Sequence, residues 1–251
     1  MYRQIVGSLI YLTISRPDLS YSLGLESQFM QLSRKPHLDV VRRTLRYVSA
    51  TLDYALFHEA STELQLSGFT DADWVGSVCD RRSSSGFMFS LGSAAITWSS
   101  KKQPTVALSS TEAEYRGATV AACEVAWLEL LLGDVGIQVQ RPVVIHCDNL
   151  SSIQLAQNLV FHAKTKHIEV HYHFIRERVL DGSINLTFVR TDEHHGYYGT
   201  VASNVLAHSM TLKMQLTSYN KQKLLKFKED LELESSETDE KNDLGLISQP
   251  V

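Results

Sequence analysis

The feature that most constrains the fold is a long segment, residues 109–132, whose apolar side chains recur at helical spacing. Positions three and four residues apart lie on one side of a helix. Here that side is apolar for about five turns, apart from one acid at its N-terminal end. A stripe of this length needs a broad apolar surface to cover it, which predicts a helix lying across a sheet. The stripe comprises Glu114, Ala118, Ala121, Val125, Leu128 and Leu132.

The acid in this stripe, Glu114, is therefore expected to face the sheet. Carboxylates are rarely buried without a partner, so the position predicts a metal ion or a basic group beside it. Glu112 lies about 200° further around the helix and is expected to face away. For Glu112 we infer only a favourable interaction with the N-terminal end of the helix dipole.

Strand patterns occur on both sides of this helix. Three predicted strands precede it, a fourth follows it, and a fifth comes after two shorter predicted helices. This order predicts an α/β fold with a mixed five-stranded sheet flanked by helices. The expected strands lie near residues 64–71, 86–89, 95–98, 143–147 and 184–189, and the shorter helices lie near residues 149–158, 165–180 and 201–210.

The chain divides into three segments that differ in hydrophobic pattern and composition. Residues 1–60 are predicted to be helical, with one helix whose apolar face holds Leu38, Val41, Leu45 and Val48. Residues 61–212 carry the sheet pattern. Residues 213–251 are rich in lysine and then in acids, with few aromatic residues, which predicts a mostly disordered tail.

Charge and cysteine content narrow the function classes. The net charge is −4. The segment from Leu216 onward contains five lysines and eight acids, whereas the rest of the chain is nearly neutral, with 19 basic and 20 acidic residues. A nearly neutral domain is compatible with nucleic acid if its acids hold metal. Three distant cysteines without a Cys-x-x-Cys pair argue against a disulfide framework or a zinc site. With no signal peptide or spanning segment in view, we expect a soluble intracellular protein of the cytoplasm or nucleus, without membrane contact.

Two further acids lie at strand ends. Asp71 lies at or near the end of the first strand, and Asp148 follows the apolar strand 143–147. Carboxylates at the ends of neighbouring strands converge, which is costly unless a cation lies between them. Oxygen ligands of this kind suit magnesium. Asp73 shares a strand face with Asp71, and spacing alone does not choose between them.

The acids and the residues around them also resemble a known protein family. Several motifs, found in order over roughly residues 2–190, resemble the ribonuclease H region of copia-type LTR retrotransposon Pol polyproteins. Residues 2–57 resemble the end of the preceding reverse transcriptase. The motifs are Thr70-Asp71-Ala72-Asp73-Trp74, Asp80-Arg81-Arg82-Ser83-Ser84-Ser85-Gly86, Trp98-Ser99-Ser100-Lys101-Lys102-Gln103, Ser109-Ser110-Thr111-Glu112-Ala113-Glu114-Tyr115, Cys147-Asp148-Asn149 and Lys164-Thr165-Lys166-His167-Ile168.

The resemblance implies a ribonuclease H-like fold and two-metal cleavage of the RNA strand in RNA–DNA hybrids, with Mg²⁺ or Mn²⁺ as cofactor. It places the catalytic, metal-binding carboxylates at Asp71, Glu114 and Asp148. It thereby favours Asp71 over Asp73, and it agrees with the helical phase of Glu114.

Two departures from the family pattern bear on activity. No Tyr-x-Asp-Asp motif occurs, so no polymerase active site is expected in this chain. The family's fourth acid is replaced by Ser203 or Asn204, and Asp192 substitutes only if its loop folds back. His194 or His195 is a weaker candidate for assisting proton transfer. We therefore expect a weakened enzyme. The alternatives are an inactive nucleic-acid-binding remnant and a decayed transposon fragment.

The remaining histidines and the tryptophans are expected to be structural. His167, His171 and His173 have spacings that suit zinc, but no further ligand is suggested. The tryptophans, Trp74, Trp98 and Trp127, are expected to pack in the core or on the sheet.

Overall fold

The computed structural model describes residues 1–53, 56, 64–77, 79–157 and 174–190. The predicted helix at residues 201–210, the predicted disordered tail and the start of the helix expected at 165–180 lie outside this part. Residues 174–180, at the end of that expected helix, are helical.

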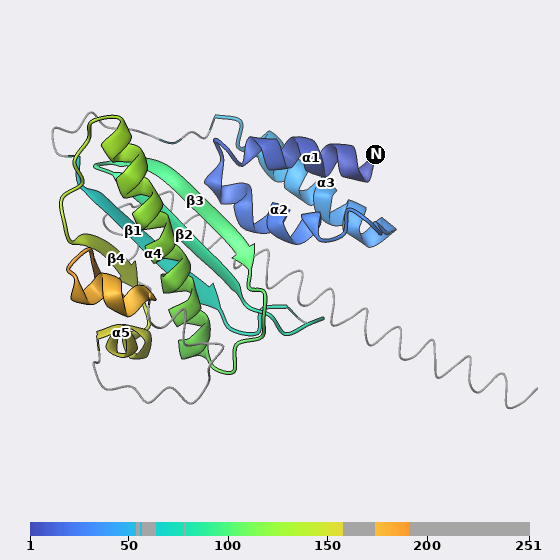
Figure 1. The fold of residues 1–251 in the computed structure, drawn as a ribbon. Coiled ribbons are helices and arrows are strands. Elements are labelled where there is room, and N and C mark those ends of the chain that lie inside the picture. The colour runs from blue at the N-terminus through green and yellow to red at the C-terminus, as the bar shows by residue number, and fades with distance from the viewer. Residues whose placement is uncertain (54–55, 57–63, 78, 158–173, 191–251) are drawn as a thin grey trace, which may run out of the picture. The chain divides into compact units, whose positions relative to one another are not determined.

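The sheet has the five strands that the sequence predicts: β1 (Leu66–Asp73), β2 (Ser84–Leu91), β3 (Ala94–Lys102), β4 (Val143–Cys147) and β5 (Ile184–Phe188). They are arranged in the order β3-β2-β1-β4-β5 (Figure 1). The pairs β1–β2 and β2–β3 are antiparallel, whereas β1–β4 and β4–β5 are parallel. The mixed five-stranded sheet with flanking helices confirms the predicted fold class.

The long helix α4 (Ser110–Asp134) lies across one face of this sheet (Figure 1). Its N-cap is Ser109, whose hydroxyl accepts a hydrogen bond from the Glu112 N–H at 3.1 Å. Every member of the predicted stripe is buried, and the apolar members belong to the main core cluster. Gly117 faces β1 closely enough that a Cβ there would lie 3.5 Å from the Ala72 Cβ. The predicted phase of this helix is confirmed.

The strand β1 alternates strictly between buried and partly exposed residues. Gly68 and Ala72 belong to the buried set, which faces α4, while Phe69 and Asp71 belong to the other face. On that second face the Phe69 ring stacks on the His146 ring of β4, with centroids 4.7 Å apart.

The N-terminal helices α1 (Tyr2–Leu12), α2 (Ser20–Ser27) and α3 (Lys35–Ala50), with a short 3₁₀ turn at Pro17–Leu19, enclose a core of their own. Val41 is fully buried there and Leu38 and Val48 pack beside it, as predicted. Leu45, however, is exposed, because the buried side of α3 is centred on Val41 and Thr44. The expectation that Leu45 belongs to this face is wrong.

The N-terminal helices also contact the edge strand β3. The Trp98 indole N–H donates a hydrogen bond of 2.8 Å to the carbonyl of Thr13, at the end of α1. A Cβ at Gly24 of α2 would lie 3.5 Å from the Ser100 carbonyl oxygen. The N-terminal helices and the sheet belong to the same compact unit. The boundaries expected at residues 60 and 212 stay predictions.

Only one of the three tryptophans packs as expected. Trp98 lies on the sheet, whereas Trp74 and Trp127 are each 53% exposed. Trp127 lies on the outer side of α4, and Trp74 follows the end of β1, where its N–H donates to the Ala107 carbonyl at 3.2 Å. The prediction was wrong for these two, because neither position lies under another element.

In the part of the chain that the structure describes, no helix is both long and apolar enough to cross a membrane.

Candidate active site

The three predicted acids come from three different elements. Asp71 lies near the end of β1, Asp148 directly follows β4, and Glu114 lies in the first turns of α4. Because β1 and β4 are parallel neighbours, their C-terminal ends lie at the same edge of the sheet. The register pairs Phe69 with His146, and Asp71 and Asp148 each follow this last pair by two residues along their own segment.

Glu114 reaches this edge from the helix above it. Its side chain is only 6% exposed, and its Oε1 accepts a hydrogen bond of 3.0 Å from the backbone N–H of Ala72. Its Oε2 is buried and accepts no hydrogen bond from an N–H or hydroxyl group among the described residues. The Asp71 carboxyl is close enough to form a hydrogen bond with Glu114 if one of the two groups is protonated. The expectation that Glu114 faces the sheet is confirmed. Two carboxyl groups this close, one of them buried, indicate a shared proton or a cation.

The electrostatics of Glu114 follow from this position. Burial, which is the largest cause, and the nearby charges of Asp71 and Asp148 together raise the pKa of its carboxyl to about 9. The Ala72 N–H acts in the opposite sense. Two or three carboxylates this close do not all ionise without a compensating positive charge, and a divalent ion supplies one.

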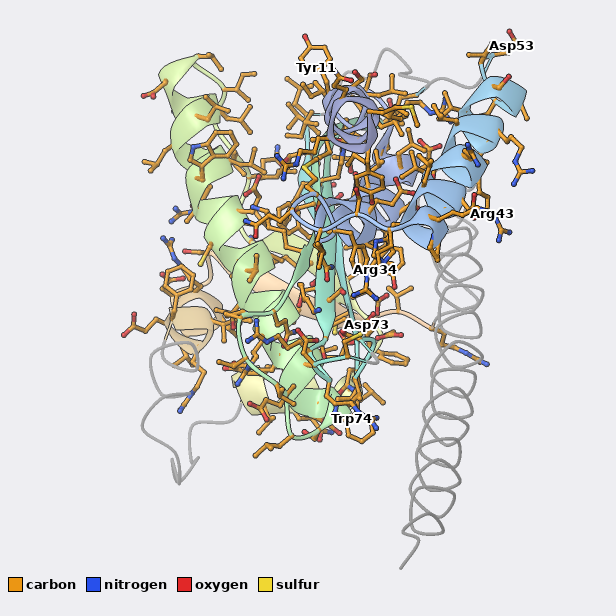
Figure 2. The ribbon with its side chains drawn as sticks, turned by 90° about the vertical axis from the view of Figure 1, so that its right-hand side faces the viewer. Tyr11, Arg34, Arg43, Asp53, Asp73 and Trp74 are labelled. Atoms are coloured by element: carbon orange, nitrogen blue, oxygen red, sulfur yellow. The ribbon has the colours of Figure 1, made fainter. Side chains whose placement is uncertain are left out.

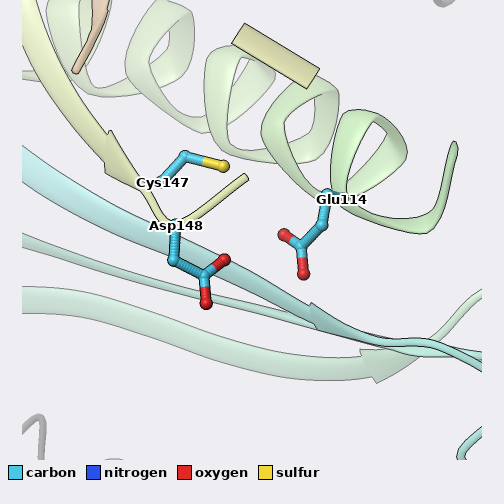
Figure 3. A group of neighbouring side chains, drawn as sticks. All are labelled: Glu114, Cys147 and Asp148. Atoms are coloured by element: carbon cyan, nitrogen blue, oxygen red, sulfur yellow. The ribbon is translucent and has the colours of Figure 1, made fainter. Parts of the chain in front are cut away.

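The donor atoms available to such an ion include one that the sequence did not single out. Ligand atoms of Glu114, Cys147 and Asp148 all lie within 4.8 Å of one another (Figure 3). Cys147 is buried, its Sγ lies 3.4 Å from the Ser152 hydroxyl, and burial raises the pKa of its thiol to about 11. The thiol therefore stays protonated, and the carboxylate oxygens are the donors that fit a hard cation such as Mg²⁺.

The spacing of the three cysteines gave no role to Cys147. One signal could have placed it near the acids: strand alternation turns Cys147 toward α4, the side from which Glu114 arrives. Asp148, one residue later, lies outside the strand.

The two neighbouring acids have structural partners. The Asp73 carboxylate accepts a hydrogen bond from the Ser84 N–H. It also lies near Tyr21 of α2: burial of the Tyr21 hydroxyl and the charge of Asp73 both raise the pKa of Tyr21. Glu112 accepts a hydrogen bond of 2.8 Å from the Leu108 N–H and pairs with Arg116 at 2.6 Å. The Glu112 partners belong to the helix start, as expected, but the side chain is buried because Arg116 and the preceding loop cover it.

Other candidates lie outside the described residues. They are Ser203 and Asn204, where the resemblance implies a fourth acid, Asp192, which was suggested as its substitute, and the histidines His167, His171, His173, His194 and His195.

Comparison with protein-family models finds no match. Among curated proteins, the chain is 44% identical over 192 residues to the retrovirus-related Pol polyprotein from transposon RE1 of Arabidopsis thaliana, covering 76% of this chain and 13% of that protein. It is 41% identical over 194 residues to the corresponding polyprotein from transposon TNT 1-94 of Nicotiana tabacum, covering 77% and 14%. A shorter relative, secreted RxLR effector protein 161 of Plasmopara viticola, is 43% identical over 51% of this chain and 90% of its own length. The chain thus spans about one seventh of the polyproteins that it matches.

Among solved structures, the chain is similar to LC11-RNase H1 in complex with an RNA/DNA hybrid, with a TM-score of 0.38 and 14% identity over 51% of this chain and 87% of that one. It is also similar to the foamy viral protease-reverse transcriptase in complex with an RNA/DNA hybrid, with a TM-score of 0.41 and 15% identity over 73% and 28%. The strand order and register, rather than these low scores, define the fold.

Proposed function

Because the chain belongs to the retrovirus-related Pol polyproteins of transposons, we propose that its α/β part is a ribonuclease H domain that cleaves the RNA strand of an RNA–DNA hybrid. In this proposal residues 1–60 are the end of a reverse transcriptase region, residues 61–212 are the nuclease and residues 213–251 are a tail. The resemblance of the sequence motifs supports a copia-type element.

The observation that carries the proposal is that ligand atoms of Glu114 and Asp148 lie within 4.8 Å of each other, and that Asp71 is close enough to Glu114 to raise its pKa. The setting of Glu114 is the strongest part of it, because this buried carboxyl lies beside two other acids and no N–H or hydroxyl group satisfies its Oε2. The raised pKa of Glu114 supports the same reading, since perturbed carboxyl groups cluster at functional sites.

The residues present fit divalent ions such as Mg²⁺ or Mn²⁺. Asp71 and Asp148 would hold them from the sheet edge, and Glu114 from the helix. When bound, such ions activate water and stabilise the charge that develops on the scissile phosphate. The chain itself orients Glu114 through the Ala72 N–H, so that one carboxyl oxygen is fixed and the other is free to bind.

A second candidate is hybrid binding without cleavage. The replacement of the family's fourth acid by Ser203 or Asn204 favours it, because neither side chain supplies an anionic ligand.

The test is a cleavage assay on the purified full chain with a labelled RNA–DNA hybrid and Mg²⁺ or Mn²⁺. We expect metal-dependent RNA cleavage that falls by on the order of 100-fold or more in Asp148→Asn and in Glu114→Gln. Asp134→Asn is the matched control: it removes one negative charge at the other end of α4, where the side chain is exposed.

A folded wild-type chain, checked by circular dichroism, that binds the hybrid without cutting it would reject the nuclease and favour the second candidate. Absence of both cleavage and binding would reject both functions. Cleavage that survives Asp148→Asn would show that the acids assigned here are not the active site.

A further inference from the structure

The helix α3 presents a basic face that takes no part in the acidic cluster. Its apolar side, which includes Val41, packs into the N-terminal core. Its other side is exposed to solvent, and at helical spacing it carries four basic side chains and one acid. These are Lys35, Arg42, Arg43, Arg46 and Asp39.

Within the described residues, most of this positive charge is not neutralised by ion pairs. Arg42 pairs with Asp39 at 3.1 Å, and both side chains are more than half exposed. Among the described residues, Lys35, Arg43 and Arg46 have no ion-pair partner. Figure 2 shows Arg43 projecting outward from α3 and Arg34 close to the start of the helix.

The surplus is local to the N-terminal helices. Residues 1–53 contain seven lysines and arginines against four acids, although the whole chain carries a net charge of −4. One of those acids, Asp18, is held by Arg16 at 2.7 Å, and another, Glu26, is buried. The positive face of α3 is therefore a feature of this segment that the composition of the whole chain conceals.

The geometry favours a polyanion with closely spaced charges. Lys35 and Arg46 are eleven residues apart, which is about 16 Å along a helix. A nucleic acid strand carries one phosphate per ~3.4 Å of helix axis, so the face spans about five phosphates of one strand. The guanidinium groups of Arg43 and Arg46 offer the paired donors that suit phosphate oxygens.

A lipid surface fits this face less well. A membrane-binding amphipathic helix inserts its apolar side between lipids. In α3 that side already packs against α1 and α2 in the protein core.

We propose that the exposed face of α3, formed by Lys35, Arg42, Arg43 and Arg46, binds the phosphate backbone of a nucleic acid duplex, at a surface separate from the acidic cluster. The inference rests on the proposed function only in taking an RNA–DNA hybrid as that duplex. It requires no cleavage.

The test is the salt dependence of hybrid affinity, measured with the full chain in EDTA so that nothing is cut. The slope of log K against log salt is compared for the wild type, Arg43→Gln, Arg46→Gln and the double variant. Each lost phosphate contact is expected to lower the slope by about 0.9, and the double variant by about 1.8. Arg141→Gln is the matched control, because Arg141 is comparably exposed but is paired with Glu129 at 2.7 Å. It should leave the slope unchanged.

An unchanged slope in the folded double variant would overturn the proposal, even if the wild type cleaves hybrid. A lowered slope would support it, even if the wild type proves inactive as a nuclease. A second arm uses vesicles containing phosphatidylserine. If the double variant loses vesicle binding but shows the wild-type salt dependence of hybrid affinity, α3 is a lipid-binding surface and the proposal is wrong.

Discussion

At the scale of single residues, the protein buries two glutamates in different settings. Glu114 lies among other acids at the sheet edge, whereas Glu26 is buried in the N-terminal helices with a hydroxyl as its partner. Thr44 of α3 donates a hydrogen bond of 2.6 Å to Glu26 Oε1, and the Tyr2 hydroxyl of α1 donates to the Glu26 backbone carbonyl. Oε2 of Glu26 has no partner in the described residues.

Burial of Glu26 makes the stability of the N-terminal helices depend on pH. Burial raises the pKa of this carboxyl from 4.5 to about 7, so the folded state binds its proton more tightly than the unfolded state does. The contribution of this group to the free energy of unfolding is therefore fully present below pH 4.5. It is lost as the pH rises through 7, by about 3 kcal/mol for a shift of this size. We expect Glu26→Gln to be more stable than the wild type at pH 8 and to lose the dependence between pH 4.5 and 7.

Thermal unfolding at pH 5 and pH 8 checks this prediction. At pH 5 the two proteins should unfold at similar temperatures, because the wild-type carboxyl is then neutral. A Glu26→Gln protein that is destabilised equally at both pH values would show that the ionised carboxylate is tolerated in this core.

At the scale of elements, the antiparallel pair β1–β2 depends on one residue without a side chain. Gly68 is paired with Phe89, whose side chain is fully buried. A Cβ at residue 68 would overlap the Phe89 ring and lie 2.9 Å from the Met88 carbonyl oxygen. The absence of a side chain in β1 thus creates the space that the largest core residue of β2 fills.

Gly68→Ala should therefore lower the free energy of unfolding by about 1–3 kcal/mol, as overpacking of a core does. Chemical denaturation of Gly68→Ala, Phe89→Leu and the double variant measures the effect. The pair should show a coupling energy of at least about 0.5 kcal/mol, because the smaller side chain relieves the clash. Gly133→Ala is the control, since a Cβ there meets nothing within 4 Å. Additive effects of the two substitutions would contradict this account.

At the scale of the whole molecule, the core of the N-terminal helices is separate from the main core between the sheet and α4. The hydrogen bond from Trp98 on β3 to the Thr13 carbonyl joins them. Since α2 also packs against β3 at Gly24, we expect the N-terminal helices to depend on this edge of the sheet for part of their stability.

Trp98→Phe should selectively loosen the N-terminal helices. Loss of the bond leaves the Thr13 carbonyl without its donor, at a cost of about 1–2 kcal/mol. Hydrogen exchange is expected to show about tenfold less protection of the α1–α3 amides, with the α4 amides unchanged. Trp127→Phe on the outer side of α4 should change neither set. An equal loss of protection in both sets would mean that the two cores unfold together.

The sequence by itself determined the elements, and through them much of the candidate site. The apolar stripe of residues 114–132 placed Glu114 against the sheet, because helical periodicity is a local property of the backbone. The positions of Asp71 and Asp148 after apolar strands predicted a common edge for the same reason. The choice of Asp71 over Asp73 came from the family resemblance rather than from periodicity.

Only the tertiary structure decided which side chains meet and which are covered. It brought Cys147 beside Glu114 and Asp148, engaged Asp73 with the Ser84 N–H, and buried Glu26. It also left Trp74, Trp127 and Leu45 exposed.

Local periodicity indicates which side of an element a residue occupies. Whether another element covers that side depends on how helices and strands distant in the sequence pack together, and that packing defines the environment of each charge.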